Sequence, residues 1–244
     1  MSVRRFLVAA PPQRGLAVLD PEASKHAVKV LRLAPGDAVV LFDGRGVEWA
    51  GTIVGASKKG VRVEVGEPRA SARVQGPRVV LGTAAPKGRR MSVLLSMVTE
   101  AGADEVVPVV CARSAVRGAG PSKVEHWRRT LAEAARQCGR AWMPSLEPEV
   151  GLEEFLARPR AERQRRLLAT TTGDPPSLLS LLAGAPAPAA VLLLVGPEGG
   201  LTSAEEEAAA AAGFEPCSLG PHTLRVETAA VAAVVGVRFC SSGN

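Results

Sequence analysis

Two glycine-bearing segments in the C-terminal third combine residue types that could bind a ligand and act on it. The segment Gly196-Pro197-Glu198-Gly199-Gly200 follows an apolar run, and its three glycines would let the backbone approach a ligand beside a carboxylate. A plain tight turn is the alternative interpretation. The segment Ser218–Ala229 bends at Gly220-Pro221 and then carries Arg225 and Glu227. Ligands of open α/β sheets bind beyond the carboxyl ends of the strands, so both segments are candidates for one site.

Arg225 lies in an acidic part of the chain. Residues 170–244 carry two basic and seven acidic side chains, whereas residues 1–169 carry 28 and 17, and the whole chain has a formal net charge of +6. Arg225 is therefore either half of an ion pair, with Glu227 or Glu198, or a cation directed at a ligand. The basic excess of the first two thirds favours a polyanionic partner. With 3% aromatic residues and no tyrosine, the sequence disfavours RNA recognition on an aromatic stacking platform.

Several other chemistries fit the sequence poorly. Gly44-Arg45-Gly46 has Trp49 where a dinucleotide fingerprint needs its third glycine, and Gly55–Gly60 lacks the lysine of a phosphate-binding loop. The three histidines and four cysteines have no metal-ligand spacing, so no metal is expected and the cysteines are interpreted as reduced, mostly buried thiols. Without an export signal or a run of 18 apolar residues, we expect a cytoplasmic protein that does not enter a membrane.

The first seventy residues predict a small β-barrel. Strands are expected near residues 5–9, 38–42, 47–54 and 61–65, separated by tight turns. Asp20-Pro21 is a helix start, and the apolar positions that follow predict about three helical turns ending before Pro35. Residues 71–77, within a segment of low apolar content with two prolines, are the predicted linker.

From residue 78 the pattern changes to alternating strands and helices. Strands are expected at residues 79–83, 105–110, 167–171, 191–195 and 217–219, and helices at about 91–101, 122–138, 176–183, 203–212 and 226–239. Apolar runs such as residues 191–195 are typical of central strands covered on both faces, which predicts an α/β domain with a mostly parallel sheet over residues 78–244. Thr202 and Glu205 form a predicted capping box at the start of one helix.

Taken in order along the chain, these segments resemble the signature of the RsmE family, whose members are SPOUT-superfamily methyltransferases that act on ribosomal RNA. The resemblance rests on Gly196–Thr202, Leu219–Pro221 and Leu224–Ala229. Weaker matches extend it over nearly the whole chain, from Arg4-Arg5-Phe6 to Gly139-Arg140. It implies a PUA-like RNA-binding barrel at residues 1–70, a knotted SPOUT-like methyltransferase domain at residues 78–244, and a homodimer.

The resemblance also implies the reaction, which is transfer of a methyl group from S-adenosylmethionine (SAM) to N3 of one uridine in 16S rRNA of the small ribosomal subunit. Uridine N3 must lose a proton, so a fixed cation beside the carbonyl oxygens would stabilise the developing anion, and Arg225 is the candidate. The sequence leaves three candidates for the proton acceptor, which are Glu227, Glu198 and water. Glu227 is the one that we predict to be catalytic together with Arg225. The implied cofactor-binding residues are Thr171, Leu194, Gly196, Pro197, Glu198, Gly199, Ser218, Leu219, Gly220 and Leu224.

The chain departs from the family pattern at three places. It has His222 where the family usually has Arg, Val226 where it has Thr, and residues 97–102 replace Lys-Ala-Thr-Glu-Leu-Gly. His222 weakens a phosphate-binding role at that position, since neutral imidazole is a poorer anchor than a guanidinium. A valine at position 226 indicates that this side chain is not itself catalytic.

The rRNA is expected to contact basic side chains in the first two thirds of the chain. The predicted RNA-binding residues are Arg4, Arg5, His26, Arg32, Lys87, Arg90 and Arg140. The cluster Arg158–Arg166 could be a further patch or a charged surface loop. Two alternative functions stay open, namely a SPOUT methyltransferase acting on another rRNA or tRNA nucleotide, and a non-catalytic ribosome-assembly factor. The apolar final helix, residues 226–239, is the expected dimer contact.

Overall fold

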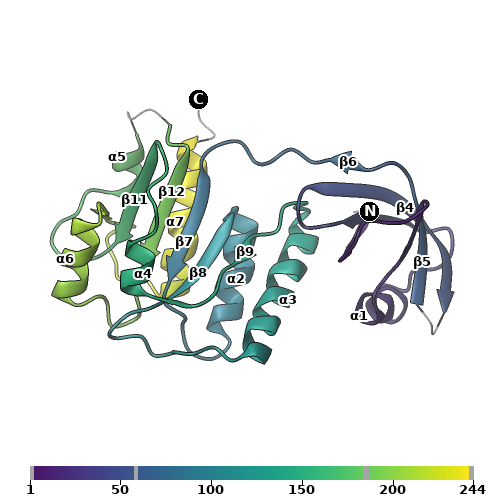
Figure 1. The fold of residues 1–244 in the computed structure, drawn as a ribbon, viewed down its shortest axis with the longest axis horizontal. Helices are drawn as coiled ribbons and strands as arrows, with labels where there is room; N and C mark the ends of the chain where they lie inside the picture. The colour runs from purple at the N-terminus through teal and green to yellow at the C-terminus, as the bar shows by residue number, and fades with distance from the viewer. Residues whose placement is uncertain (1–2, 58–59, 184–186, 242–244) are drawn as a thin grey trace. The chain divides into compact units, whose positions relative to one another are not determined.

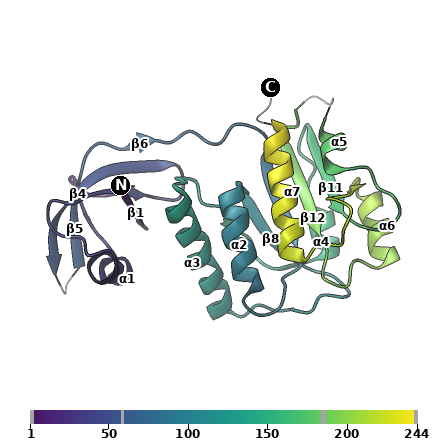
Figure 2. The same ribbon diagram turned by 180° about the vertical axis from the view of Figure 1, so that it is seen from behind.

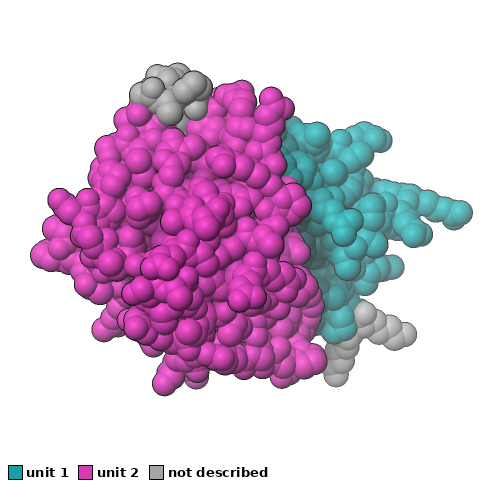
Figure 3. Space-filling view, turned by 60° about the vertical axis from the view of Figure 1, so that its left-hand side comes forward, with its two compact units in different colours: residues 1–73, 132–143 teal, residues 74–131, 144–244 magenta. Residues whose placement is uncertain are grey.

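The computed structural model describes residues 3–57, 60–183 and 187–241. The chain divides into two compact units, coloured separately in Figure 3. Unit 1 comprises residues 1–73 and 132–143, and unit 2 comprises residues 74–131 and 144–244. Residues 132–143, at the end of a long helix, thus return to the N-terminal unit, which a pass along the sequence does not anticipate. The domain limits at residues 70 and 78 stay a prediction.

Unit 1 is a small, mainly antiparallel β-structure. Its sheet has the order β1-β3-β4-β5-β2, in which β1 runs parallel to β3 and the other pairs are antiparallel, and β6 pairs with β4. The alternation in Val61-Arg62-Val63 places the two valines in a core with Phe6 and Leu41. The strands are β1 (Arg4–Leu7), β2 (Leu16–Val18), β3 (Ala38–Phe42), β4 (Val47–Ser57), β5 (Gly60–Val65) and β6 (Arg69–Ala70).

The helical segment of unit 1 is shorter and less regular than the sequence predicts. Asp20 caps helix α1 (Pro21–Lys25) by accepting a hydrogen bond from Ala23 N at 2.8 Å, as expected. The chain then forms a π-helical turn, η1 (His26–Val30), instead of continuing as an α-helix. Arg32 adopts φ = 57°, which is incompatible with a continuing right-handed helix, so the helix ends before Pro35.

Gly46 lies directly against Trp142. Trp142 belongs to the segment that returns to unit 1 at the end of the long helix. Gly46 has φ = 98°, and a Cβ there would lie 2.2 Å from the indole ring. The indole donates from Nε1 to Ser71 O at 2.9 Å, and the Arg73 guanidinium lies 4.0 Å from the ring centroid. The Gly44-Arg45-Gly46 segment, which fails as a dinucleotide fingerprint, therefore serves packing within unit 1.

We expect Gly46→Ala to lower the free energy of unfolding by about 2–3 kcal/mol, because the new methyl group would overlap Trp142 and alanine disfavours this φ. Gly36→Ala is the matched control, since Gly36 has φ = 99° and no neighbouring atom within 4 Å of its Cβ position. It should cost only about 1 kcal/mol, the conformational part. Urea unfolding of both variants measures the difference, and equal losses would contradict the steric argument.

Unit 2 is built on a fully parallel sheet with the order β10-β8-β7-β12-β11-β13, and β9 pairs with β8. Strand β12 is buried along its whole length, which confirms the prediction of a central strand. The strands are β7 (Arg78–Thr83), β8 (Glu105–Val110), β9 (Ser145–Leu146), β10 (Val150–Gly151), β11 (Gln164–Ala169), β12 (Ala190–Val195) and β13 (Glu215–Cys217).

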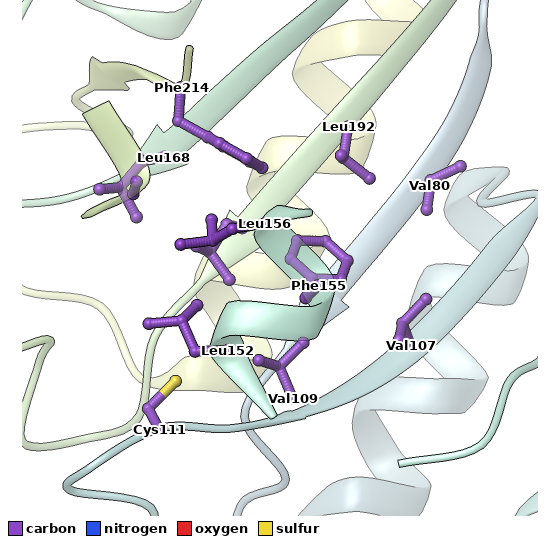
Figure 4. Packing of buried hydrophobic residues seen from close by; sticks show 12 residues of the cluster. Val80, Val107, Val109, Cys111, Leu152, Phe155, Leu156, Leu168, Leu192 and Phe214 are labelled. Atoms are coloured by element: carbon purple, nitrogen blue, oxygen red, sulfur yellow. The ribbon is translucent and has the colours of Figure 1, made fainter. Parts of the chain in front are cut away.

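Helices cover both faces of this sheet. Helices α2 and α7 pack together on one face (Figure 2), and α4 and α6 lie on the other (Figure 1). On the second face, Phe155 of α4 lies over Gly82, where a Cβ would approach the ring to 2.2 Å, and 6.2 Å from the ring of Phe214 (Figure 4). The helices are α2 (Arg90–Ala101), α3 (Pro121–Cys138), α4 (Leu152–Leu156), α5 (Leu178–Leu182), α6 (Ser203–Ala211) and α7 (Val226–Ser241).

Candidate functional site

The candidate site is a cavity of about 340 Å³ in unit 2, at the carboxyl ends of three neighbouring strands. The loops after β12 and β13 both line it, as predicted from their glycines. Strand β11 lies between β12 and β13, and the loop that follows it supplies a third wall. The lining comprises Arg113, Leu168–Thr172, Val195–Leu201, Glu206, Leu219, Gly220, His222–Leu224, Val226 and Ala229.

The loop after β12 is a tight turn with a charged side chain anchored behind it. Gly200 N donates to Pro197 O at 2.9 Å, and Gly200 adopts φ = 69°, a conformation that favours glycine. Glu198 accepts a hydrogen bond from Arg90 of α2 at 2.7 Å. The turn then leads into α6, whose capping box between Thr202 and Glu205 is confirmed.

The loop after β13 is shaped by Ser218. Its Oγ donates to Gly220 O at 3.1 Å and accepts from Gly220 N at 3.3 Å, while its backbone pairs with Pro176 O and Leu178 N. The predicted Gly220-Pro221 corner is thereby fixed in a bend that leaves Leu219 and Leu224 on the cavity wall. Ser218 does not line the cavity itself, so its effect there is on the shape of the loop.

The third wall joins the loop after β11 to α6. Both Thr170 Oγ1 and Thr172 Oγ1 donate to Glu206 Oε1, at 3.0 and 3.1 Å. Thr172 N also donates to Thr170 Oγ1 at 3.0 Å. Thr171, which was expected to bind the cofactor, lies between these residues and lines the cavity.

Arg113, in the loop after β8, reaches the rim of the cavity. Its Nη1 donates to Gly199 O at 2.8 Å and to Leu201 O at 3.2 Å, so it holds the glycine loop from outside. Its charge also acts on Glu205. Burial raises the pKa of the Glu205 carboxyl, but hydrogen bonds from Thr202 and Ala112, together with the Arg113 charge, outweigh this and hold that pKa below its usual range.

In the structure, neither of the two candidate acids pairs with Arg225. Glu198 pairs with Arg90, and Arg90 Nη1 lies 4.0 Å from Glu227 Oε2, so both candidate partners face Arg90 instead. Arg225 is exposed just before α7, and its side chain makes no hydrogen bond or ion pair with the described residues. Glu227 is 9% exposed, and its Oε2 has no hydrogen-bond partner in the part of the chain that the structure describes.

Eight of the ten expected cofactor-binding residues line the cavity. Leu194 does not, because it is fully buried in the core beneath α4, and its neighbour Val195 lines the cavity in its place. Sequence reasoning missed Thr170, Thr172, Arg113 and Glu206. The predicted strand over residues 167–171 includes Thr170 and Thr171, but β11 ends at Ala169, which leaves the run of threonines in the loop. Nothing in the sequence indicates that Arg113 would reach this site.

The predicted RNA-binding residues fall into three groups. Arg4, Arg32 and Lys87 are exposed, which leaves them available for phosphate contacts. Arg5 pairs with Glu48 and lies 5.0 Å from the Phe42 ring, and Arg90 pairs with Glu198. His26 and Arg140 are half-buried within unit 1. For all seven, RNA binding stays a prediction.

The described residues were also compared with the features of membrane-spanning helices and metal sites. The helices they form include no segment long and apolar enough to cross a membrane. Among the same residues, no group of three or more His, Cys, Asp or Glu side chains is placed to hold a metal ion. Of the four free thiols, Cys111 and Cys217 are buried, and burial raises the pKa of each to about 12, while Cys138 and Cys240 are exposed.

Comparison with protein families matches both parts of the chain. The model of a family described as an RNA methyltransferase domain matches residues 74–237, and one described as an RNA methyltransferase PUA domain matches residues 19–66. Together with the parallel sheet and the cavity beyond its strands, these matches define the chain as a PUA-containing RNA methyltransferase of the SPOUT fold class, and the fold class expected from the sequence is confirmed.

Comparison with individual proteins identifies the family more specifically. A ribosomal RNA small subunit methyltransferase E from Mycobacterium bovis is 33% identical over 161 residues, which cover 64% of this chain and 61% of that protein. The crystal structure of a ribosomal RNA small subunit methyltransferase E from Neisseria gonorrhoeae, bound to S-adenosyl methionine, superposes with a TM-score of 0.87 at 27% identity over 98% of each chain. A Legionella pneumophila structure in complex with bound SAM gives a TM-score of 0.89 at 30% identity, again over 98% of each chain. The chain belongs to the RsmE family of RNA methyltransferases.

Proposed function

We propose that this protein methylates N3 of one uridine in 16S rRNA of the small ribosomal subunit, with SAM as methyl donor. The observation that carries the proposal is the convergence of three loops, after β11, β12 and β13, on one cavity in a chain of this family. The reaction and the cytoplasmic setting in which ribosomes are modified are taken from the family resemblance.

The cavity suits SAM in size and chemistry. Its volume of about 340 Å³ lies within the range of small-molecule sites. Backbone groups of residues 196–200 and 219–220 can recognise a purine edge, and Leu219, Leu224 and Val195 supply apolar contact. When bound, SAM supplies an activated methyl group on a sulfonium.

Arg225 and Glu227 are the residues we assign to the acceptor uridine. The unpaired Arg225 guanidinium would donate to a uridine carbonyl oxygen and stabilise the anion that forms as N3 loses its proton. Glu227 is the assigned proton acceptor. Its Oε2 lies 4.0 Å from Arg90 Nη1 and has no hydrogen-bond partner among the described residues, whereas Glu198 accepts a hydrogen bond from Arg90 at 2.7 Å. Water is the alternative acceptor.

The decisive test is the methylation state of 16S rRNA from a strain that lacks this gene. The proposal expects one N3-methyluridine to be missing and to return when the gene is restored, and calorimetry of the purified protein should show SAM binding. An intact 16S rRNA with another RNA undermethylated would contradict the substrate. Absence of SAM binding would contradict the enzyme and favour a ribosome-assembly factor.

We further propose that Arg4 and Arg32 of unit 1, with Lys87 of unit 2, contact rRNA phosphates. On single-stranded RNA the logarithm of the affinity should fall with the logarithm of salt concentration by about 0.7 per phosphate contact. Arg32→Ala combined with Lys87→Ala is therefore expected to reduce the slope by about 1.4. Arg14→Ala, which removes another exposed arginine of unit 1, is the control. Filter binding at several salt concentrations measures the slope, and an unchanged slope would remove both residues from the RNA contact.

The proposed homodimer contact is narrower than the whole final helix. Val226, Ala230, Val234 and Val237 are buried within the chain itself. The large apolar side chains that stay exposed on α7 are Val235 and Phe239, one helical turn apart, at 40% and 80% exposure. The neighbouring α2 likewise exposes Val93 and Met97. Exposed apolar side chains gathered on two packed helices indicate a contact surface.

We expect Phe239→Asp to convert the proposed dimer to a monomer, since it would place a charge in the apolar contact. Val54→Asp, on an exposed strand position of unit 1, should leave the dimer intact. Sedimentation velocity distinguishes the two species. A wild-type protein that sediments as a monomer would contradict the dimer, and a dimeric Phe239→Asp variant would place the contact elsewhere.

A further inference from the structure

Two carboxylates, Glu198 and Glu206, line the cavity, and a third, Glu205, adjoins Glu206 in the first turn of α6. The protein compensates the charges of Glu198 and Glu205. Glu198 pairs with Arg90 at 2.7 Å. Glu205 accepts hydrogen bonds from Thr202 N and Ala112 N, at 2.8 and 2.7 Å, and lies in the field of Arg113. Both charges are therefore compensated before any ligand enters.

The remaining carboxylate, Glu206, is different. It lines the cavity and receives only the hydroxyls of Thr170 and Thr172, both on Oε1. Its Oε2 has no hydrogen-bond partner, and neither oxygen has a salt bridge, within residues 3–57, 60–183 and 187–241. Its two hydroxyl donors are neutral, and beyond them only the N-terminal turn of α6 favours its charge, so the described residues give Glu206 no cationic partner.

An uncompensated carboxylate in a concave wall is a binding site for a cation. The concave wall focuses the field of this carboxylate, which strengthens its attraction for positive charge. The charge-assisted hydrogen bonds that it could form are roughly twice as strong as neutral ones. A ligand with a positive group would thus supply the compensation that the protein provides for Glu198 and Glu205.

We propose that Glu206 is the cation-binding residue of the donor site and holds a positively charged group of the methyl donor. This inference rests on the proposed function. SAM carries two such groups, the sulfonium and the α-ammonium, and either can face the free Oε2. The two threonines are positioning residues that fix the carboxylate for this contact.

Calorimetry with three ligands tests the assignment. S-adenosylhomocysteine keeps the ammonium but has a neutral thioether, and 5′-methylthioadenosine lacks both cations. Glu206→Gln, which preserves shape and the threonine hydrogen bonds, is expected to weaken SAM binding by about tenfold. Binding of 5′-methylthioadenosine should stay within about twofold. Loss for S-adenosylhomocysteine equal to that for SAM identifies the ammonium as the bound cation, and no loss identifies the sulfonium.

Glu207→Gln is the matched control, because it removes a charge one position along α6 from an exposed side chain outside the cavity. Equal weakening of all three ligands by Glu206→Gln, or no weakening of any, would overturn the role of Glu206. The double variant Thr170→Val with Thr172→Val keeps the charge of Glu206. If it weakens the binding of all three ligands equally, the threonines shape the loop and do not position Glu206. A wild-type protein that binds none of the ligands would contradict the proposed function as well.

Discussion

Replacement of Arg225 by alanine is expected to lower the rate of methyl transfer by about 10²–10³-fold. One preorganised donor at a developing anion typically contributes about 3–4 kcal/mol to transition-state stabilisation. The side chain is exposed and makes no bond with the described residues, so its removal should leave the fold intact. It does not line the cavity, so the affinity for SAM should stay within about twofold. Single-turnover methylation of 16S rRNA and calorimetry with SAM separate these effects.

Arg225→Lys sharpens this test. Lysine keeps the charge but loses the planar fork of the guanidinium, so an intermediate rate is expected if two donors face the uridine carbonyl. A rate for Arg225→Ala within tenfold of the wild-type rate would contradict the assigned role. Weaker SAM binding at an unchanged rate would instead place Arg225 in the donor site.

The two glycine loops could be predicted because glycines, a capping box and an apolar strand are visible within a short stretch of sequence. Gly196–Gly200 and Gly220-Pro221 reveal tight bends wherever they occur, and the parallel sheet brings such bends to one edge. Arg90 illustrates the limit. It is one of the basic side chains predicted to bind RNA, and that role stays a prediction, but its pairing with Glu198, 108 residues away, is not evident from the sequence. Such a pairing depends on the order of strands, which residue spacing does not reveal.

The cluster Arg158–Arg166 is a second case in which the sequence does not reveal the partners of charged side chains, here in the protein core. Arg166 is 4% exposed, and its guanidinium donates to the carbonyls of Leu156 and Ala212. Arg165 forms two hydrogen bonds with Glu215 of the neighbouring strand. Both arginines lie within β11, so the strand begins three residues before the predicted start at Leu167. Charged side chains conceal a strand from pattern analysis when their partners come from distant segments.

Arg238 is the other cation of the acidic C-terminal third. It differs from Arg225 in both burial and hydrogen bonding. It is 9% exposed, and its guanidinium donates to Gly102 O at 2.6 and 3.0 Å, to Pro77 O at 2.9 Å and to Asp104 at 2.6 Å. It thereby ties α7 to the start of the sheet and to the end of α2. Charge alone does not distinguish the two arginines, because both are isolated cations among acids, whereas the position of Arg225 in the loop before the final helix does.

We expect Arg238→Met to lower the free energy of unfolding by about 3–5 kcal/mol, because the substitution removes the cation beside Asp104, whose side chain is 13% exposed, and takes a donor from the carbonyls of Gly102 and Pro77. Arg225→Ala should change that free energy by at most about 0.5 kcal/mol. Urea unfolding of both variants measures the contrast. A double variant, Arg238→Met with Asp104→Asn, should recover part of the loss, because the uncompensated charge is gone. If Arg238→Met were neutral in stability while Arg225→Ala destabilised the fold, the structural and catalytic assignments of the two arginines would be reversed.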